Sequence, residues 1–91
     1  MNQNPVARLS AADRNRRLQM SLDKGDRVRQ DRRNPDVWLV SSATHSNVWY
    51  RVRDGRSCGC EGFRQRGICR HLVRISWERF TAKRAAAAVA A

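Results

Sequence analysis

The segment SCGCEGFRQRGICRH, residues 57–71, contains all 3 cysteines of the chain and one of its 2 histidines. Thiolates and imidazole nitrogens are the ligands that structural Zn²⁺ sites use, with four of them completing a tetrahedron. The order is Cys58-x-Cys60, eight further residues, and then Cys69-x-His71. Three thiols cannot all pair within one chain, so we interpret these four residues as ligands of one Zn²⁺ ion.

The spacing of these ligands constrains the backbone. Residues i and i+2 of an extended chain lie about 6.5 to 7 Å apart, whereas two ligands of one zinc ion must approach to about 4 Å. The chain must therefore bend between the first two cysteines, where it has Gly59. Residues i and i+2 of a helix diverge by about 200°, so we expect Cys69 just before a helix and His71 in its first turn. The intervening residues are expected to form a loop that returns at Gly67 and is anchored by Phe63.

The ligand set also bears on chemistry. Three thiolates and one imidazole leave no position for water, so we expect a structural metal rather than a catalytic one. No other nucleophile and base stand at a recognisable spacing, so we expect no enzymatic activity. Redox sensing is a subordinate alternative, because thiol oxidation would eject the metal. The arginines that surround the ligands should lower the pKa of the thiols and favour metal binding; they are Arg56, Arg64, Arg66 and Arg70.

The flanking sequence predicts the elements that position the ligands. Residues 37–42 and 48–53 are rich in β-branched and aromatic residues and are separated by turn residues, which predicts a hairpin. After Arg70, apolar residues recur at three- and four-residue spacings, which predicts an amphipathic helix. The turn between the two predicted strands contains His45, which we expect to be an ordinary surface residue because the ligand set is already full.

The N-terminal part predicts another helix. Ser10 and Asp13 form a capping pair and Gly25 is a typical stop, so residues 11–24 are expected to be helical. The fold class is therefore α+β: a zinc-stabilised ββα unit preceded by an N-terminal helix. We divide the chain into a flexible N-terminus (1–9), the helix with a polar linker (10–36), the zinc unit (37–84) and an Ala-rich tail (85–91).

The order C-x-C, a short loop and C-x-H resembles the SWIM zinc finger. Phe63 follows the second cysteine by three residues, and CRHLV around His71 has the basic residue and the leucine that are common in this family. The resemblance covers roughly residues 37–76, and GDRV after a helix looks like the lead-in of bacterial members. Arg74 and Gly62 depart from the pattern, since a small residue is common at the first position and an acidic or small polar residue at the second.

The resemblance implies a compact ββα unit around one zinc ion. SWIM domains occur in Mutator-type transposases, in or beside bacterial remodelling-type helicases, in recombination accessory proteins and in some ubiquitin-pathway proteins. They are taken to bind DNA or proteins there. The resemblance thus implies either a nucleic-acid-binding accessory of a helicase, transposase or recombination machine, or a protein-interaction adaptor that docks on a larger DNA-processing enzyme.

The charge of the chain favours the first of these functions. The net charge is +11. Of the 19 basic residues, only Lys24 and Lys83 are lysines, and the others are arginines, which pair well with phosphate. We predict binding of nucleic acid, DNA rather than RNA, without sequence selectivity, since phosphate contacts carry no sequence information. The best candidates flank the zinc unit: Arg51, Arg53, Arg64, Arg66, Arg70 and Arg74.

The aromatic residues allow two interpretations. Trp49 shares a predicted strand face with Arg51 and Arg53, where it could stack on an unpaired base. It could equally be covered by the N-terminal helix, and we favour that alternative. The other large aromatic side chains are expected in the core: Trp38, Trp77 and Phe80.

Hydropathy bears on location. No segment approaches the roughly 20 apolar residues of a membrane span, and MNQNPVARLS at the start has no apolar stretch typical of a signal peptide. We therefore expect a cytoplasmic protein, with association with the nucleoid as a further possibility. A reducing compartment disfavours disulfides, which agrees with the metal interpretation.

Overall fold

The computed structural model describes residues 5–42 and 47–90, with side chains up to residue 82, so His45 lies outside the described residues. Its strands form an antiparallel 4-stranded sheet in the order β1-β2-β3-β4, and the fold is of the expected α+β class. The elements in chain order are the 3-10 helix η1 (Pro5–Arg8), α1 (Ala11–Asp23), β1 (Val28–Gln30), β2 (Val37–Ser41), β3 (Trp49–Arg53), β4 (Ser57–Cys58), α2 (Glu61–Arg66) and α3 (Arg70–Ala90).

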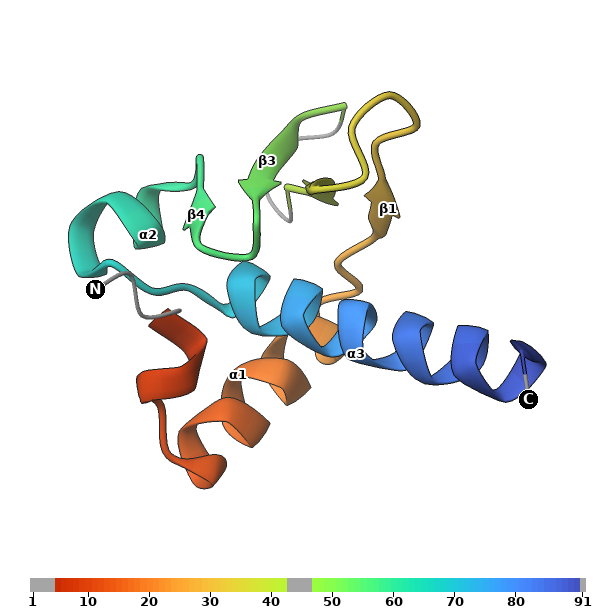
Figure 1. The fold of residues 1–91 in the computed structure, drawn as a ribbon. Coiled ribbons are helices and arrows are strands. Elements are labelled where there is room, and N and C mark those ends of the chain that lie inside the picture. The colour runs from red at the N-terminus through yellow and green to blue at the C-terminus, as the bar shows by residue number, and fades with distance from the viewer. Residues whose placement is uncertain (1–4, 43–46, 91) are drawn as a thin grey trace.

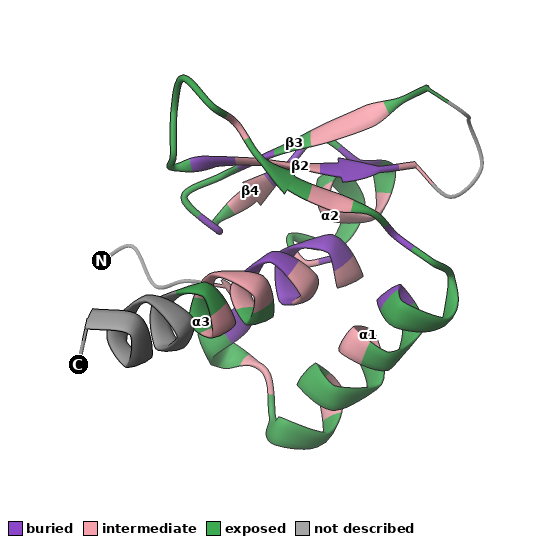
Figure 2. Cartoon of the chain, turned by 90° about the vertical axis from the view of Figure 1, so that its right-hand side faces the viewer, coloured by how far each residue is buried: buried purple, intermediate pink, exposed green. Residues whose placement is uncertain are grey.

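The elements are arranged in layers around α3 (Figure 1). One side of α3 contacts β3 and β4, and the other side contacts α1 and η1. Figure 2 shows the sheet above α3 and α1 below it, with the buried residues of α3 in the turns nearest the sheet. Within the described part of the chain, no helix covers the face of the sheet that points away from α3.

The hydrophobic core lies between the sheet and the first turns of α3. Val40 of β2 and Val52 of β3 are fully buried there, and Leu72 and Ile75 meet them from α3. Because successive strand residues point to opposite faces, the neighbours of these valines point away from α3. The inner face of the sheet is therefore apolar, whereas its outer face mixes arginines with Leu39 and Trp49.

Several predicted elements are confirmed. The helix α1 begins after Ser10, whose Oγ accepts a hydrogen bond from the backbone N–H of Asp13 at 3.1 Å. The chain leaves this helix through Gly25, which has a positive φ of 70°. The predicted hairpin is the pair β2 and β3, with Val40 opposite Tyr50.

Other segments differ from the expectation. The predicted polar linker contains β1, which pairs with the edge of β2, and the predicted zinc loop contains α2. A three-residue strand is too short to produce a recognisable periodic pattern. Part of the N-terminus expected to be flexible forms η1, because Val6 is 5% exposed and packs in the core. The backbone of α3 continues through the Ala-rich tail to Ala90.

The predictions for several aromatic residues were also wrong. Trp38 packs against the core as expected, but Trp77 is 41% and Phe80 58% exposed, because they line an open hollow between α1 and α3 and do not lie under the sheet. Trp49 is not covered by α1, which packs on the opposite side of α3. No helix within the described residues is long and apolar enough to cross a membrane.

The core makes a first prediction. Replacing Leu72, which is 0% exposed, by alanine should lower the free energy of unfolding of the metal-loaded protein by about 2 to 5 kcal/mol, because the packed core cannot collapse into the cavity. Leu22→Ala is the matched control, since Leu22 is 41% exposed, and should cost less than about 1 kcal/mol. Urea unfolding measures both values, and equal losses would contradict this description of the core.

Candidate metal centre

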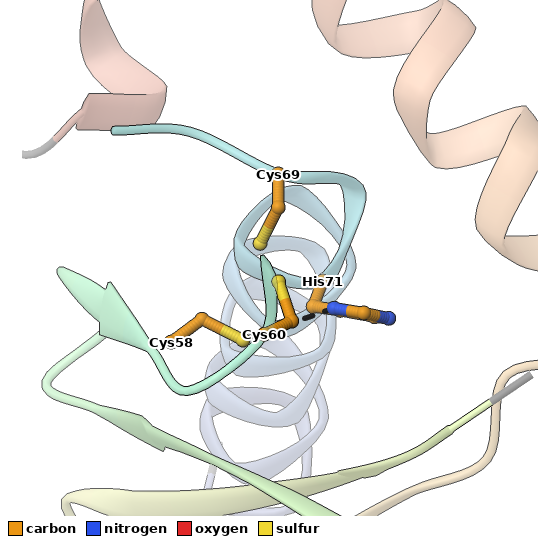
Figure 3. A group of neighbouring side chains, drawn as sticks. All are labelled: Cys58, Cys60, Cys69 and His71. Carbon is orange, nitrogen blue, oxygen red and sulfur yellow. Dashed lines mark hydrogen bonds between the residues drawn. The ribbon is translucent and has the colours of Figure 1, made fainter. Parts of the chain in front are cut away.

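Cys58, Cys60, Cys69 and His71 converge on one buried point. Their candidate ligand atoms all lie within 4.8 Å of one another. The Sγ of Cys58 is 3.7 Å from Nδ1 of His71, close to the separation of two ligands on one tetrahedral zinc ion, about 3.5 to 4 Å. Figure 3 shows the three cysteine side chains directed toward a common centre beside the imidazole. The group could hold one metal ion, and its three sulfurs and one nitrogen suit zinc.

Three consecutive elements position these ligands. Cys58 ends β4, and Cys60 is the N-cap of the six-residue helix α2. Gly67 ends that helix in the left-handed conformation, with φ of 72°, and turns the chain back toward the site. Cys69 precedes α3 and His71 lies in its first turn, as the spacing predicts. Phe63 packs against the core, so the predicted anchor is confirmed although it stands on a helix.

The role expected for Gly59 is not supported. The φ of Gly59 is not among the positive values, and a Cβ added there would meet nothing within 4 Å. The bend between Cys58 and Cys60 arises because β4 ends there and α2 begins, so an ordinary residue could make it.

Backbone N–H groups are directed at the sulfur atoms. The N–H of Phe63 donates to Sγ of Cys60 at 3.4 Å, as part of the cap of α2. The backbone N–H groups of Cys60 and Leu72 likewise act to lower the pKa of Cys58 and Cys69. Hydrogen bonds of this kind stabilise thiolates more than thiols, because they are stronger when the acceptor is charged. They suit metal-bound sulfur.

The three thiols differ in acidity. A hydrogen bond from Cys58, helped by His71 and the Leu72 N–H, lowers the pKa of Cys69 to about 4. The same hydrogen bond, together with burial, raises the pKa of Cys58, and burial raises that of Cys60. The shifts in thiol pKa therefore arise from hydrogen bonding and burial within the cluster, and not from the surrounding arginines as the sequence predicted. A metal ion that binds all three sulfurs as thiolates must therefore displace protons from the thiols whose pKa is raised.

A buried carboxylate lies behind His71. With Nδ1 of His71 facing the sulfurs, its Nε2 points to Oδ2 of Asp26 at 4.0 Å. That Nε2 is buried and has no hydrogen-bond partner among the described residues. Metal-binding histidines commonly donate their second N–H to a carboxylate, which fixes the ring and makes it a stronger ligand. Asp26 is placed for this role and needs to close by about 1 Å to form the bond.

Asp26 also joins α1 to α3. Its side chain is 0% exposed, accepts a hydrogen bond from Oγ of Ser21 at 2.7 Å, and pairs with Arg70 through two bonds of 2.9 and 3.2 Å. Burial alone would raise the pKa of Asp26, but the hydrogen bonds from Arg70 and Ser21 outweigh burial and lower it. The carboxylate therefore stays ionised beside the metal ligands.

The six arginines predicted to bind nucleic acid fall into three pairs. Arg51 and Arg53 are exposed on β3, and Arg64 and Arg66 are exposed on α2. The third pair is Arg70 and Arg74 on α3, and both are bound within the protein. Arg70 pairs with Asp26, and Arg74 pairs with Glu78 at 2.9 Å while its own side chain is only 13% exposed.

Sequence reasoning missed Asp26 and Ser21, which lay in the predicted linker and the predicted helix with no role assigned to either. An acidic residue directly after a helix stop normally faces water, and its partner Arg70 stands 44 positions away. No local pattern reveals such a pair.

No protein-family model, curated protein or solved structure matches this chain. The description of the metal centre therefore rests on the geometry and chemistry of its own residues.

The ligand set makes a second prediction. The protein should contain one zinc ion per chain by elemental analysis, and Cys58→Ser should lose the zinc and the cooperative unfolding transition. The reason is that the free energy of metal binding is spent on folding when the ligands converge only in the native state. Ser57→Ala, at the neighbouring half-buried position, should keep both. A Cys58→Ser protein that is folded and free of metal would refute the structural role.

The carboxylate makes a third prediction. Asp26→Asn should weaken zinc binding about 10- to 100-fold, because the amide accepts hydrogen bonds but lacks the charge that strengthens the His71 ligand. Competition with a chromophoric chelator measures the affinity. Asp23→Asn removes the same charge from an exposed position and should leave the affinity unchanged. Equal affinities for wild type and Asp26→Asn would exclude the positioning role of Asp26.

Proposed function

We propose that this chain is a non-enzymatic zinc module that binds nucleic acid, DNA rather than RNA, through an arginine-rich surface. The observation that carries the proposal is the convergence of four buried ligand side chains within 4.8 Å of one another. A complete set of protein ligands suits a metal that stabilises the fold and does not act on a substrate. The net charge of +11 supports a polyanionic partner.

Zinc would act by holding the sheet to α3. Its ligands come from the end of β4, the start of α2 and the first turn of α3, so a bound ion would link three elements whose apolar contacts are few. The ligand order and the hairpin followed by a helix support the resemblance to SWIM zinc fingers. On that basis we propose an accessory role beside a helicase, a transposase or recombination machinery.

Only part of the arginine set remains available to a partner. Arg70 and Arg74 are held by Asp26 and Glu78, so their contribution is structural. Arg51, Arg53, Arg64 and Arg66 are exposed and form no ion pair within the described residues. These four are the remaining candidates for phosphate contacts from the original set.

A second candidate function is a protein-interaction adaptor. Trp77 and Phe80 are exposed large apolar residues beside a hollow of about 310 Å³ between α1 and α3. Leu18 and Val73 also line this hollow. A partner that inserted an apolar side chain there would bury surface that α1 alone does not cover.

Salt dependence gives the fourth prediction. Zinc-loaded protein should bind labelled DNA, with affinity falling linearly on a double-logarithmic salt scale. Four phosphate contacts would weaken binding roughly 50- to 150-fold between 50 and 200 mM salt. Fluorescence anisotropy measures this for single- and double-stranded probes, with Trp77→Ala as a control that should bind normally. Absence of salt-sensitive binding to either probe would overturn the proposed function and leave the adaptor.

A further inference from the structure

The face of the sheet that points away from α3 carries an unusual set of side chains. Strand register places Arg29, Leu39 and Arg51 in one row across β1, β2 and β3. They alternate with Val40 and Val52, which face the core, so they lie on the opposite face. This face has no helix over it within the described residues.

A second row lies beside the first. The backbones of Arg27 and Ser41 are hydrogen-bonded to each other, and Ser41 stands opposite Trp49 on β3. Ser41 is small, so the indole can extend across β2 toward β1. The large side chains of these two rows, together with Arg53 of β3, form a set that we call the outer sheet face. Its members are Arg27, Arg29, Leu39, Trp49, Arg51 and Arg53.

The arginines of the outer sheet face are not neutralised within the protein. All four side chains are exposed, and none forms an ion pair among the described residues. Asp31 lies nearby, and Asp36 and Asp54 lie at the strand ends next to Arg53. Backbone hydrogen bonding from Arg33 and the charges of Arg51 and Arg33 hold the pKa of Asp31 low, so it is ionised and offsets one charge only. An excess of positive charge therefore remains on this face.

The indole ring of Trp49 lies among these arginine side chains. The guanidinium carbon of Arg29 is 4.8 Å and that of Arg27 5.5 Å from the centre of its indole ring. Next to this cluster is a hollow of about 440 Å³ with Leu39 and Arg29 in its lining. Aromatic rings and guanidinium planes both stack on nucleobases, and free guanidinium groups pair with phosphate. The outer sheet face combines both kinds of contact.

We propose that the outer sheet face binds single-stranded nucleic acid, with an unpaired base stacked at Trp49 and Arg29 and the phosphates held by Arg27, Arg51 and Arg53. This inference rests on the proposed nucleic-acid function and specifies its site. A duplex could use the charges, but its bases are already stacked on one another and offer no face to an indole. The presence of the ring among the arginines is what favours a single strand.

The exposed arginines of α2 are the competing surface. Arg66 lines a hollow between α1 and α2 with Arg16 and Arg17, and no aromatic residue lines it. Arg16 is already paired with Asp13 at 3.0 Å. The α2 surface therefore offers positive charge without an aromatic ring in the lining of its hollow, and it serves as the comparison for the outer sheet face.

The test compares zinc-loaded variants on a single-stranded and a double-stranded DNA of the same sequence. Trp49→Ala should weaken single-strand binding roughly 5- to 150-fold while its salt slope stays unchanged, because stacking is lost and charge is not. The double variant Arg51→Gln/Arg53→Gln should reduce the slope of log affinity against log salt by about 1.4, the value for two phosphate contacts on a single strand. Arg64→Gln/Arg66→Gln removes the same charge from the competing surface on α2 and should reduce that slope less than Arg51→Gln/Arg53→Gln does.

The outcomes separate the inference from the proposed function. If wild type binds DNA but Trp49→Ala binds a single strand equally well, or if the α2 double variant reduces the slope at least as much as Arg51→Gln/Arg53→Gln does, the outer sheet face is not the site and the proposed function stands. If wild type binds no DNA, both fail. Should Trp49→Ala not fold, as judged by zinc content, Arg27→Gln/Arg29→Gln replaces it and must also weaken single-strand binding.

Discussion

The convergence of four ligand side chains between β4, α2 and α3 is the constraint on which this structure depends. The largest fully buried apolar side chains are Leu72, Ile75, Val40 and Val52, a small core for a chain of 91 residues. Small domains with so little burial commonly need a metal or disulfides to be stable. Here the cysteines are part of the core itself, since they pack with the same valines and leucine. A bound ion would therefore stabilise the contact between sheet and helix from within.

His71 connects this constraint to the N-terminal helix. One nitrogen of its ring faces the sulfurs and the other faces Asp26, which is bonded to Ser21 of α1 and Arg70 of α3. A buried carboxylate is tolerated only with such partners, because an unpaired charge away from water is costly. Since the same carboxylate lies behind the imidazole and joins the two helices, binding of a metal ion at His71 would be coupled to the docking of α1. The N-terminal helix is thus part of the metal-binding unit.

The parts of the fold that sequence could predict are those set by local geometry. The spacing of Cys69 and His71 excludes a helix at the first and favours one at the second, and the structure has that arrangement. The cap at Ser10 follows from side-chain chemistry within one turn. What could not be predicted depends on distant partners. A run rich in arginine gives no sign that Arg70 is paired with a buried acid 44 positions earlier, whereas Arg51 forms no ion pair within the described residues.

Charge count alone therefore describes this protein poorly, and position decides what each arginine does. On α3, Arg70 and Arg74 neutralise buried or half-buried acids and stabilise the packing of the helices. On the sheet, Arg29 and Arg51 stand on the face opposite the core. A zinc ion with three thiolates has a net negative charge, but it would lie on the inner side of the sheet, with Asp26 and Arg70 beside it. The sheet would thus separate an inner centre of net negative charge from the exposed arginines of the outer sheet face. The outer arginines can attract a polyanion, as can the exposed arginines of α2, and the same alternation of side chains that builds the core keeps the outer ones exposed.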